Sequence, residues 1–513
     1  MNRIYKIVWS KAKNTYVVTS ELAKNHTKSA SGKAVKAALA AAVGMGLLMG
    51  GYTASAADNT PGAGSGVAIG TGSNAPKEEN VAVGKGATIK YSNGASTATG
   101  DVAVGSGAVI DNYASQGGSI AIGQNARVEN MAGNQEKLFA FGQTTFSGYP
   151  AIPADPSKEA GGIAIGENTF ARTGSLMVGT HNYRGKLGDV DIDSANTRET
   201  GINVNATTLG TNSYNQGAFS TVSGAYSIIS GKYNGSNWSS YAGQNFGATV
   251  MGSLNSIESA TSSSKYSGVA NSIVGTANRT ANSNGSLIFG AGNEITNSIS
   301  SISAPSTGGD SAQALQKSLM TAVKNSNSGG ATLAIGGGNT ADWTQLSQII
   351  GVNNTLKGTS GAISKFNMID GYKNTVTKAE HVSVIGSENT VENSKSQTVI
   401  GDSNKITDRN AGTVSGKQEE RTKNVSDLVI GKGNKIEGNS TYMKGYESLT
   451  VIGNNNEMVN PGAGIVIGDN QKVGAIRESV VIGSMTPEEK ADSDIRQKHA
   501  SVVVGYHAQS GTR

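Results

Sequence analysis

Residues 383–404 read SVIGSENTVENSKSQTVIGDSN, and this stretch contains one repeat unit and the start of the next. A run of mostly β-branched residues ends at Gly386, an asparagine follows at Asn389, and the pattern returns 15 residues later at Gly401 and Asn404. β-Branched residues favour strands, and glycine interrupts helices. The unit therefore predicts a strand, a glycine turn, a short second strand and a loop.

The same unit recurs from residue 67 to residue 505, at intervals of 14 or 15 residues where the array is regular. This length fits one coil of a β-solenoid, made of two short strands and two turns. The sequence thus predicts an all-β parallel β-roll with loop and short-helix insertions. The repeat glycines are Gly70, Gly84, Gly105, Gly123, Gly166, Gly386, Gly401, Gly431, Gly453, Gly468, Gly483 and Gly505.

The glycine and the asparagine of each unit have different expected roles. We expect the glycine to occupy a corner where φ is positive or where backbones stack closely. Asparagine tolerates positive φ, and stacked amides can form hydrogen bonds from coil to coil. We therefore expect Asn389, Asn404 and Asn434 to adopt positive φ and to stack.

Both faces of the repeat strands are apolar. Val67 and Ile69 share one face, whereas Ala68 points to the other. A thin coil has room for one small core, so we expect the second face to pack against another copy, with small alanines allowing close approach. On this interpretation, Ala103→Glu would place a charge in the interface between copies.

Composition narrows the class of protein. Glycine accounts for 70 of 513 residues, aromatic residues for 5%, and cysteine is absent. The net charge of +5 comes from residues 1–57, so the remaining sequence offers no basic surface for nucleic acid. Without cysteine, the chain has neither disulfides nor thiolate metal sites.

The N-terminus reads as an export signal. Residues 37–51 are apolar, too short a run for a membrane anchor, and follow Lys33 and Lys36. The small residues Ala54-Ser55-Ala56 supply a cleavage pattern, and the shifted pattern ending at Ala57 is a near-equal alternative.

We expect the exported protein to lack residues 1–56 or 1–57, because an apolar run and a small-residue site coincide there. N-terminal sequencing of the surface form tests this expectation, and a form beginning at Met1 would contradict it.

Two motifs resemble known families. Met1–Lys24 resembles the extended signal peptide region of type V secretion. The matching features are Tyr5-Lys6, Trp9 and the final residues VVTSELAK. The repeat is similar to the YadA-like head repeat of trimeric autotransporter adhesins. This resemblance implies a left-handed parallel β-roll, a homotrimer, and cell-surface or outer-membrane display, or secretion if no anchor exists. It also implies attachment to host matrix, to cell surfaces or to other bacteria.

The expected organisation is a signal over 1–57 and head repeats over 58–510, with insertions at about 129–162, 180–206, 300–330 and 484–499. Residues 311–325 have apolar residues at helical spacing, and Thr486-Pro487-Glu488-Glu489 is typical of a helix start. No C-terminal anchor is recognised, so membrane anchoring is expected through a missing C-terminal region.

No catalytic, metal-binding or cofactor-binding motif is found, and we expect a protein that is not an enzyme. The candidate binding residues are aromatic or arginine side chains in the insertions and in segment 232–246, because such side chains dominate binding energy. They are Tyr149, Tyr183, Arg184, Trp238 and Tyr241. Two alternatives are a non-binding spacer of a surface fibre and a β-solenoid enzyme that acts on polysaccharide.

Overall fold

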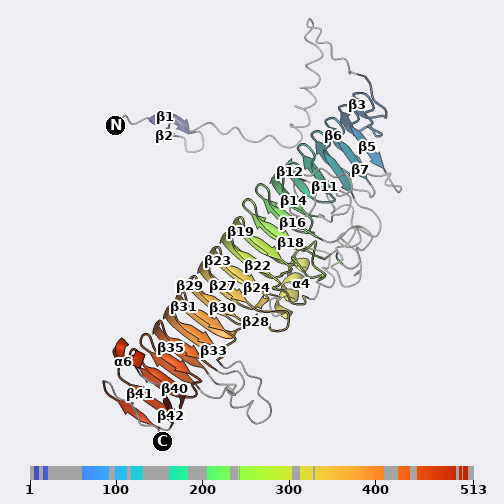
Figure 1. Ribbon diagram of the computed structural model, residues 1–513. Coiled ribbons are helices and arrows are strands. Elements are labelled where there is room, and N and C mark those ends of the chain that lie inside the picture. The colour runs from blue at the N-terminus through green and yellow to red at the C-terminus, as the bar shows by residue number, and fades with distance from the viewer. Residues whose placement is uncertain are drawn as a thin grey trace. The chain divides into compact units, whose positions relative to one another are not determined.

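The computed structural model describes residues 5–10, 15–20, 60–91, 99–112, 117–130, 161–182, 205–231, 241, 243–302, 312–326, 330–409, 426–438, 448–492, 496–499 and 501–506. The chain divides into two units, 1–57 and 58–513. In the first, β1 (Tyr5–Ser10) pairs antiparallel with β2 (Thr15–Ser20). In the second, short parallel strands stack coil upon coil (Figure 1). The predicted all-β parallel roll is confirmed.

The strands that end at the repeat glycines form one long parallel sheet, in which each strand pairs with the equivalent strand of the next coil. Val384 of β31, for example, lies beside Val399 of β33. The sheet contains β3 (Val67–Ile69), β4 (Val81–Val83), β6 (Val102–Val104), β8 (Ile120–Ile122), β10 (Ile163–Ile165), β12 (Leu176–Thr180), β13 (Thr207–Thr211), β15 (Thr221–Ser223), β17 (Thr249–Met251), β19 (Ser272–Thr276), β21 (Leu287–Ala291), β23 (Leu333–Gly337), β26 (Gln348–Val352), β29 (Met368–Tyr372), β31 (Glu380–Ser387), β33 (Lys395–Asp402), β35 (Asp427–Lys432), β37 (Leu449–Ile452), β39 (Gly464–Ile467), β41 (Ser479–Ile482) and β43 (Val502–Val504).

The second strands of the coils form the opposite wall, as two parallel sheets. The first contains β5 (Thr88–Tyr91), β7 (Val109–Asn112), β9 (Arg127–Asn130) and β11 (Phe170–Arg172). The second contains β14 (Tyr214–Asn215), β16 (Ile228–Ser230), β18 (Ser256–Glu258), β20 (Arg279–Ala281), β22 (Glu294–Thr296), β24 (Thr340–Asp342), β27 (Thr355–Lys357), β30 (Thr375–Thr377), β32 (Thr390–Glu392), β34 (Lys405–Thr407), β36 (Lys435–Glu437), β38 (Glu457–Val459), β40 (Lys472–Arg477) and β42 (Arg496–His499). Two further short strands, β25 (Thr344–Gln345) and β28 (Ser364–Lys365), pair with each other, and β28 also pairs with the start of β31.

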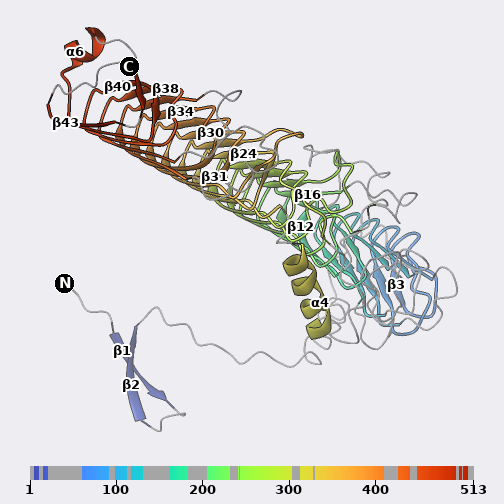
Figure 2. The same cartoon turned by 90° about the horizontal axis from the view of Figure 1, so that it is seen from below.

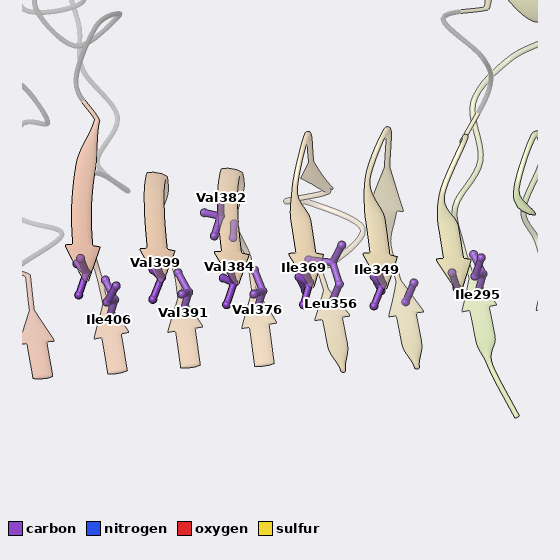
Figure 3. Packing of buried hydrophobic residues seen from close by; sticks show 14 of the residues in the cluster. Ile295, Ile349, Leu356, Ile369, Val376, Val382, Val384, Val391, Val399 and Ile406 are labelled. Atoms are coloured by element: carbon purple, nitrogen blue, oxygen red, sulfur yellow. The ribbon is translucent and has the colours of Figure 1, made fainter. Parts of the chain in front are cut away.

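The core lies between the two walls and consists of the inward-facing residues of their strands. Val384 and Val399 of the long sheet meet Val376 and Val391 of the opposite sheet, all with no exposed surface (Figure 3). In the N-terminal coils alanine takes the same inward position, as at Ala103. The expectation that the alanine face packs against another copy is therefore wrong, because the alanines fill the core of their own coil.

Every repeat glycine named above has a positive φ, between +116° and +144°. The corner at Gly386 shows why glycine is needed. A Cβ atom on Gly386 would lie 1.9 Å from the carbonyl oxygen of Gly401 in the next coil. Both reasons expected for glycine, positive φ and close backbone stacking, apply at this position.

The asparagines form a buried ladder along the inside of the corner. Nδ2 of Asn404 donates to Oδ1 of Asn389 at 2.9 Å and to the carbonyl of Gly431 at 2.8 Å. The backbone N–H of Asn404 donates to the same Oδ1 at 3.0 Å. Asn389, Asn404 and Asn434 do not have positive φ; the preceding residue, such as Glu388, does. The amides therefore stack, but the expected backbone conformation is wrong, because these side chains face inward rather than occupy the turn.

The N-terminal edge of the stack is covered by the chain itself. The N–H of Gly62 donates to the carbonyl of Ala68 at 3.0 Å, and the N–H of Gly70 donates to the carbonyl of Thr60 at 2.9 Å. Pro61 lies antiparallel beside Ile69 and has no N–H to offer to a further strand. This segment satisfies the free edge of β3, which would otherwise be a template for pairing.

Two helices interrupt the roll within the described residues. α4 (Ala312–Asn325) lies beside the stack (Figure 2). It covers the residues whose apolar spacing predicted a helix. α6 (Pro487–Asp492) begins at a capping box: the N–H of Glu489 donates to Oγ1 of Thr486 at 3.2 Å, and the N–H of Thr486 donates to Oε2 of Glu489 at 2.8 Å. The expected helix start is confirmed.

Candidate functional site

The outward face of the long sheet is an exposed apolar surface. Because strand side chains alternate, the residues on either side of each core residue point to solvent. Phe289 is 57% exposed, Met251 49% and Ile385 42%. Ala103, by contrast, is fully buried within its own coil, so a charge there would disrupt the fold of the chain itself.

We define the outer strip as the outward residues directly before each corner glycine. They lie in register from coil to coil. Along the described strands, Ser223 and Asp370 are its polar members. The strip is Ile69, Val83, Val104, Ile122, Ile165, Val178, Leu209, Ser223, Met251, Val274, Phe289, Ile335, Ile350, Asp370, Ile385, Ile400, Ile430, Ile452, Ile467, Ile482 and Val504.

Three of the insertions leave the stack without breaking its register. β12 and β13 are separated by residues 181–206, yet they pair over five residues, from Leu176 beside Thr207 to Thr180 beside Thr211. The same holds for β9 and β11, and for β22 and β24, between which α4 is inserted. The coils therefore form a continuous support from which inserted segments emerge.

Most of the candidate binding residues lie outside the described residues. These are Tyr149, Tyr183, Arg184 and Trp238, together with the cleavage residues Ala56 and Ala57. Tyr241 is described and half-buried, and its carbonyl accepts a hydrogen bond from the N–H of Gln244 at 3.0 Å. Of the candidate binding residues, the described part of the chain therefore includes Tyr241.

A buried ion pair, which the sequence did not single out, flanks residues 410–425. Nε of Arg409 lies 2.7 Å from Oδ2 of Asp427, and both side chains are almost fully buried. Asp427 also accepts hydrogen bonds from Nε2 of Gln397 at 2.7 Å and from the N–H of Leu449 at 2.8 Å. A buried pair is stable when its remaining atoms are satisfied in this way. The ion pair thus joins the residues at which the chain leaves and re-enters the stack.

A second buried polar cluster lies in the N-terminal coils. Asp101 accepts hydrogen bonds from the N–H of Ser119 at 2.9 Å, from Nδ2 of Asn112 at 2.8 Å and from the hydroxyl of Tyr91 at 3.3 Å. Burial raises the pKa of the Asp101 carboxyl. Burial also raises the pKa of Tyr91 to about 12, and the Asp101 carboxylate contributes to that rise.

The raised pKa of Asp101 predicts a pH-dependent stability of these coils. The stability associated with the protonated carboxyl is present below its ordinary pKa and is lost as pH rises through the raised value. The side chain introduced by Asp101→Asn cannot ionise. The free energy of unfolding of this variant, minus that of wild type, should therefore be larger at about pH 8 than at about pH 4. Hydrogen exchange in β4, β6 and β8, corrected for intrinsic rates, measures this difference. An equal difference at both pH values would contradict the prediction.

The described residues include no group of three or more His, Asp or Glu side chains placed to hold a metal ion. In the same part of the chain, no helix is long and apolar enough to span a membrane.

Comparisons with known proteins agree with the resemblance found in the sequence. Residues 1–50 match the family described as the extended signal peptide of the type V secretion system. A stretch of 40 residues is 55% identical to the autotransporter adhesin NhhA of Neisseria meningitidis serogroup B, and it covers 8% of this chain and 7% of the relative's length. These findings support export to the cell surface or outer membrane, and the relative is named an adhesin. Together with the parallel β-roll, they support the resemblance of this chain to trimeric autotransporter adhesins.

Proposed function

We propose that residues 58–510 form the head of a surface adhesin, which assembles as a homotrimer and attaches the cell to host matrix, to host cell-surface molecules or to other bacteria. The observation that carries this proposal is that the strands stay in register across three of the insertions, those after β9, β12 and β22. A continuous support that tolerates long inserted segments is suited to displaying binding surfaces.

The outer strip supports assembly of identical chains. An exposed apolar surface of this length is a typical interaction surface. Its residues repeat once per coil, so a matching partner must present apolar residues at the same spacing over the same length. A second copy of this chain has apolar residues at this spacing and over this length because its sequence is identical. An assembly with closed symmetry would bury the strip of every copy.

The insertions, at about 129–162, 180–206, 300–330 and 484–499, and segment 232–246 support adhesion. The threonine-rich outward positions of the opposite sheet, such as Thr355 and Thr375, offer few of the aromatic and arginine anchors that dominate binding energy. Tyr149, Tyr183, Arg184, Trp238 and Tyr241 supply such anchors. In this proposal the coils are the support, and the inserted segments make the contacts with the target surface.

We expect the double variant Tyr149→Ala, Trp238→Ala to bind the target surface at least about tenfold more weakly, because each truncation removes a large anchor. Attachment of cells displaying the variant measures this loss, while circular dichroism and oligomer mass should stay at wild-type values. Tyr226→Ala is the matched control, since Tyr226 is an exposed aromatic residue of the coils. Full adhesion after deletion of 129–162, 180–206 and 232–246 would place binding elsewhere. If the wild-type chain attached to no target surface, the alternative function, a non-binding spacer of a surface fibre, would be favoured.

A further inference from the structure

We propose that Asp370 fixes the axial register in which identical chains align along the outer strip. This inference rests on the proposed assembly and adds a specificity determinant to it.

A strip that repeats once per coil creates a register problem. Neighbouring strands lie about 4.8 Å apart, and sliding one chain by this distance brings equivalent residues together again. Ile385 of one copy would then lie at the level of Ile400 of its neighbour. The two isoleucine side chains are similarly exposed, Ile385 to 42% and Ile400 to 37%. Aliphatic contacts alone therefore distinguish poorly between aligned chains and chains displaced by one coil.

Asp370 breaks this repetition. It occupies the strip position between Ile350 and Ile385, paired in register with both, and its side chain is exposed. Among the described residues no ion pair includes Asp370. Several acidic residues elsewhere on the coils are ion-paired, as Glu380 is with Lys395 at 3.1 Å.

The charge penalises displaced assemblies more than aligned ones. In aligned chains the Asp370 carboxylates share one level, which can retain water while the levels above and below stay dry. A displacement by one coil sets each carboxylate against Ile350 or Ile385 of a neighbour and disturbs more than one level. An unpaired charge against an aliphatic surface is costly, so the aligned state is favoured. A single buried polar residue specifies the register of coiled coils in the same way.

The absence of cysteine allows a direct test by disulfide trapping. Cells would co-express and export differently tagged Ile385→Cys and Ile400→Cys chains, which report positions one coil apart. Bonds between two copies of position 385 report alignment, and bonds between positions 385 and 400 report displacement. We expect aligned bonds to exceed displaced ones by about tenfold, and Asp370→Ile to reduce this ratio to about one or two.

Glu392→Ile is the matched control, because it removes an exposed acid from the opposite sheet and should leave the ratio unchanged. A high ratio that survives Asp370→Ile in assembled chains would overturn the role of Asp370 and leave the assembly intact. If no disulfide-linked chains form and the exported chain has the mass of a monomer, both the register proposal and the proposed assembly fail.

Discussion

Gly386→Ala is expected to lower the free energy of unfolding by roughly 3–5 kcal/mol. The φ of Gly386 is +133°, a conformation that alanine rarely adopts. The new Cβ would also lie 1.9 Å from the backbone oxygen of Gly401, so β31 and β33 would have to separate. Separation would break the backbone hydrogen bonds and the asparagine ladder of these two coils.

Thermal unfolding followed by circular dichroism, with hydrogen exchange in β31 and β33, measures this effect. Gly361→Ala is the matched control, because a Cβ there would meet no atom within 4 Å and the φ of Gly361 is not positive. We expect the control to lie within about 0.5 kcal/mol of wild type. Equal stability of the two variants would contradict the close stacking of the corners.

Two adjacent residues should separate folding from assembly. Val384 is fully buried in the core, so Val384→Asp places an unpaired carboxylate among aliphatic side chains and is expected to cost several kcal/mol and unfold the surrounding coils. Ile385 points outward on the strip and is 42% exposed, so Ile385→Asp should keep the fold and weaken the association of chains.

Circular dichroism and native mass together distinguish the two outcomes. Val384→Asp should lose strand signal, whereas Ile385→Asp should keep it while its mass falls toward that of one chain. Glu392→Asp is a control that leaves the charge of the opposite sheet unchanged. A normal oligomer mass for Ile385→Asp would show that the strip is not the interface.

The sequence predicts the coil well because each unit repeats the same local rules. The strand ending at Gly386 and the amide three residues later recur often enough to fix the period and the parallel stacking. The inward face was predicted wrongly because Val-Ala-Val is apolar on both sides, and alternation alone does not say which side is buried. Only the packing of Ala103 against the opposite wall distinguishes the two faces.

Other features depend on partners far apart in the chain. Arg409 and Asp427 lie 18 residues apart and on opposite sides of an insertion, so no local pattern joins them. The cover over β3 depends on a reversal of the chain between Pro61 and Ile69 and on backbone hydrogen bonds, which the pattern of side chains does not reveal. Asp370 is an ordinary exposed acid in the sequence, and it becomes an exception once the outer strip is aligned.

Sedimentation equilibrium of the exported wild-type chain, over a range of concentrations, tests most directly that identical chains assemble along the outer strip. Assembly along the outer strip predicts a mass three times that of one chain, and a loss of that mass in Ile385→Asp without loss of strand content. A wild-type chain that remains at its single-chain mass at micromolar concentration would contradict it.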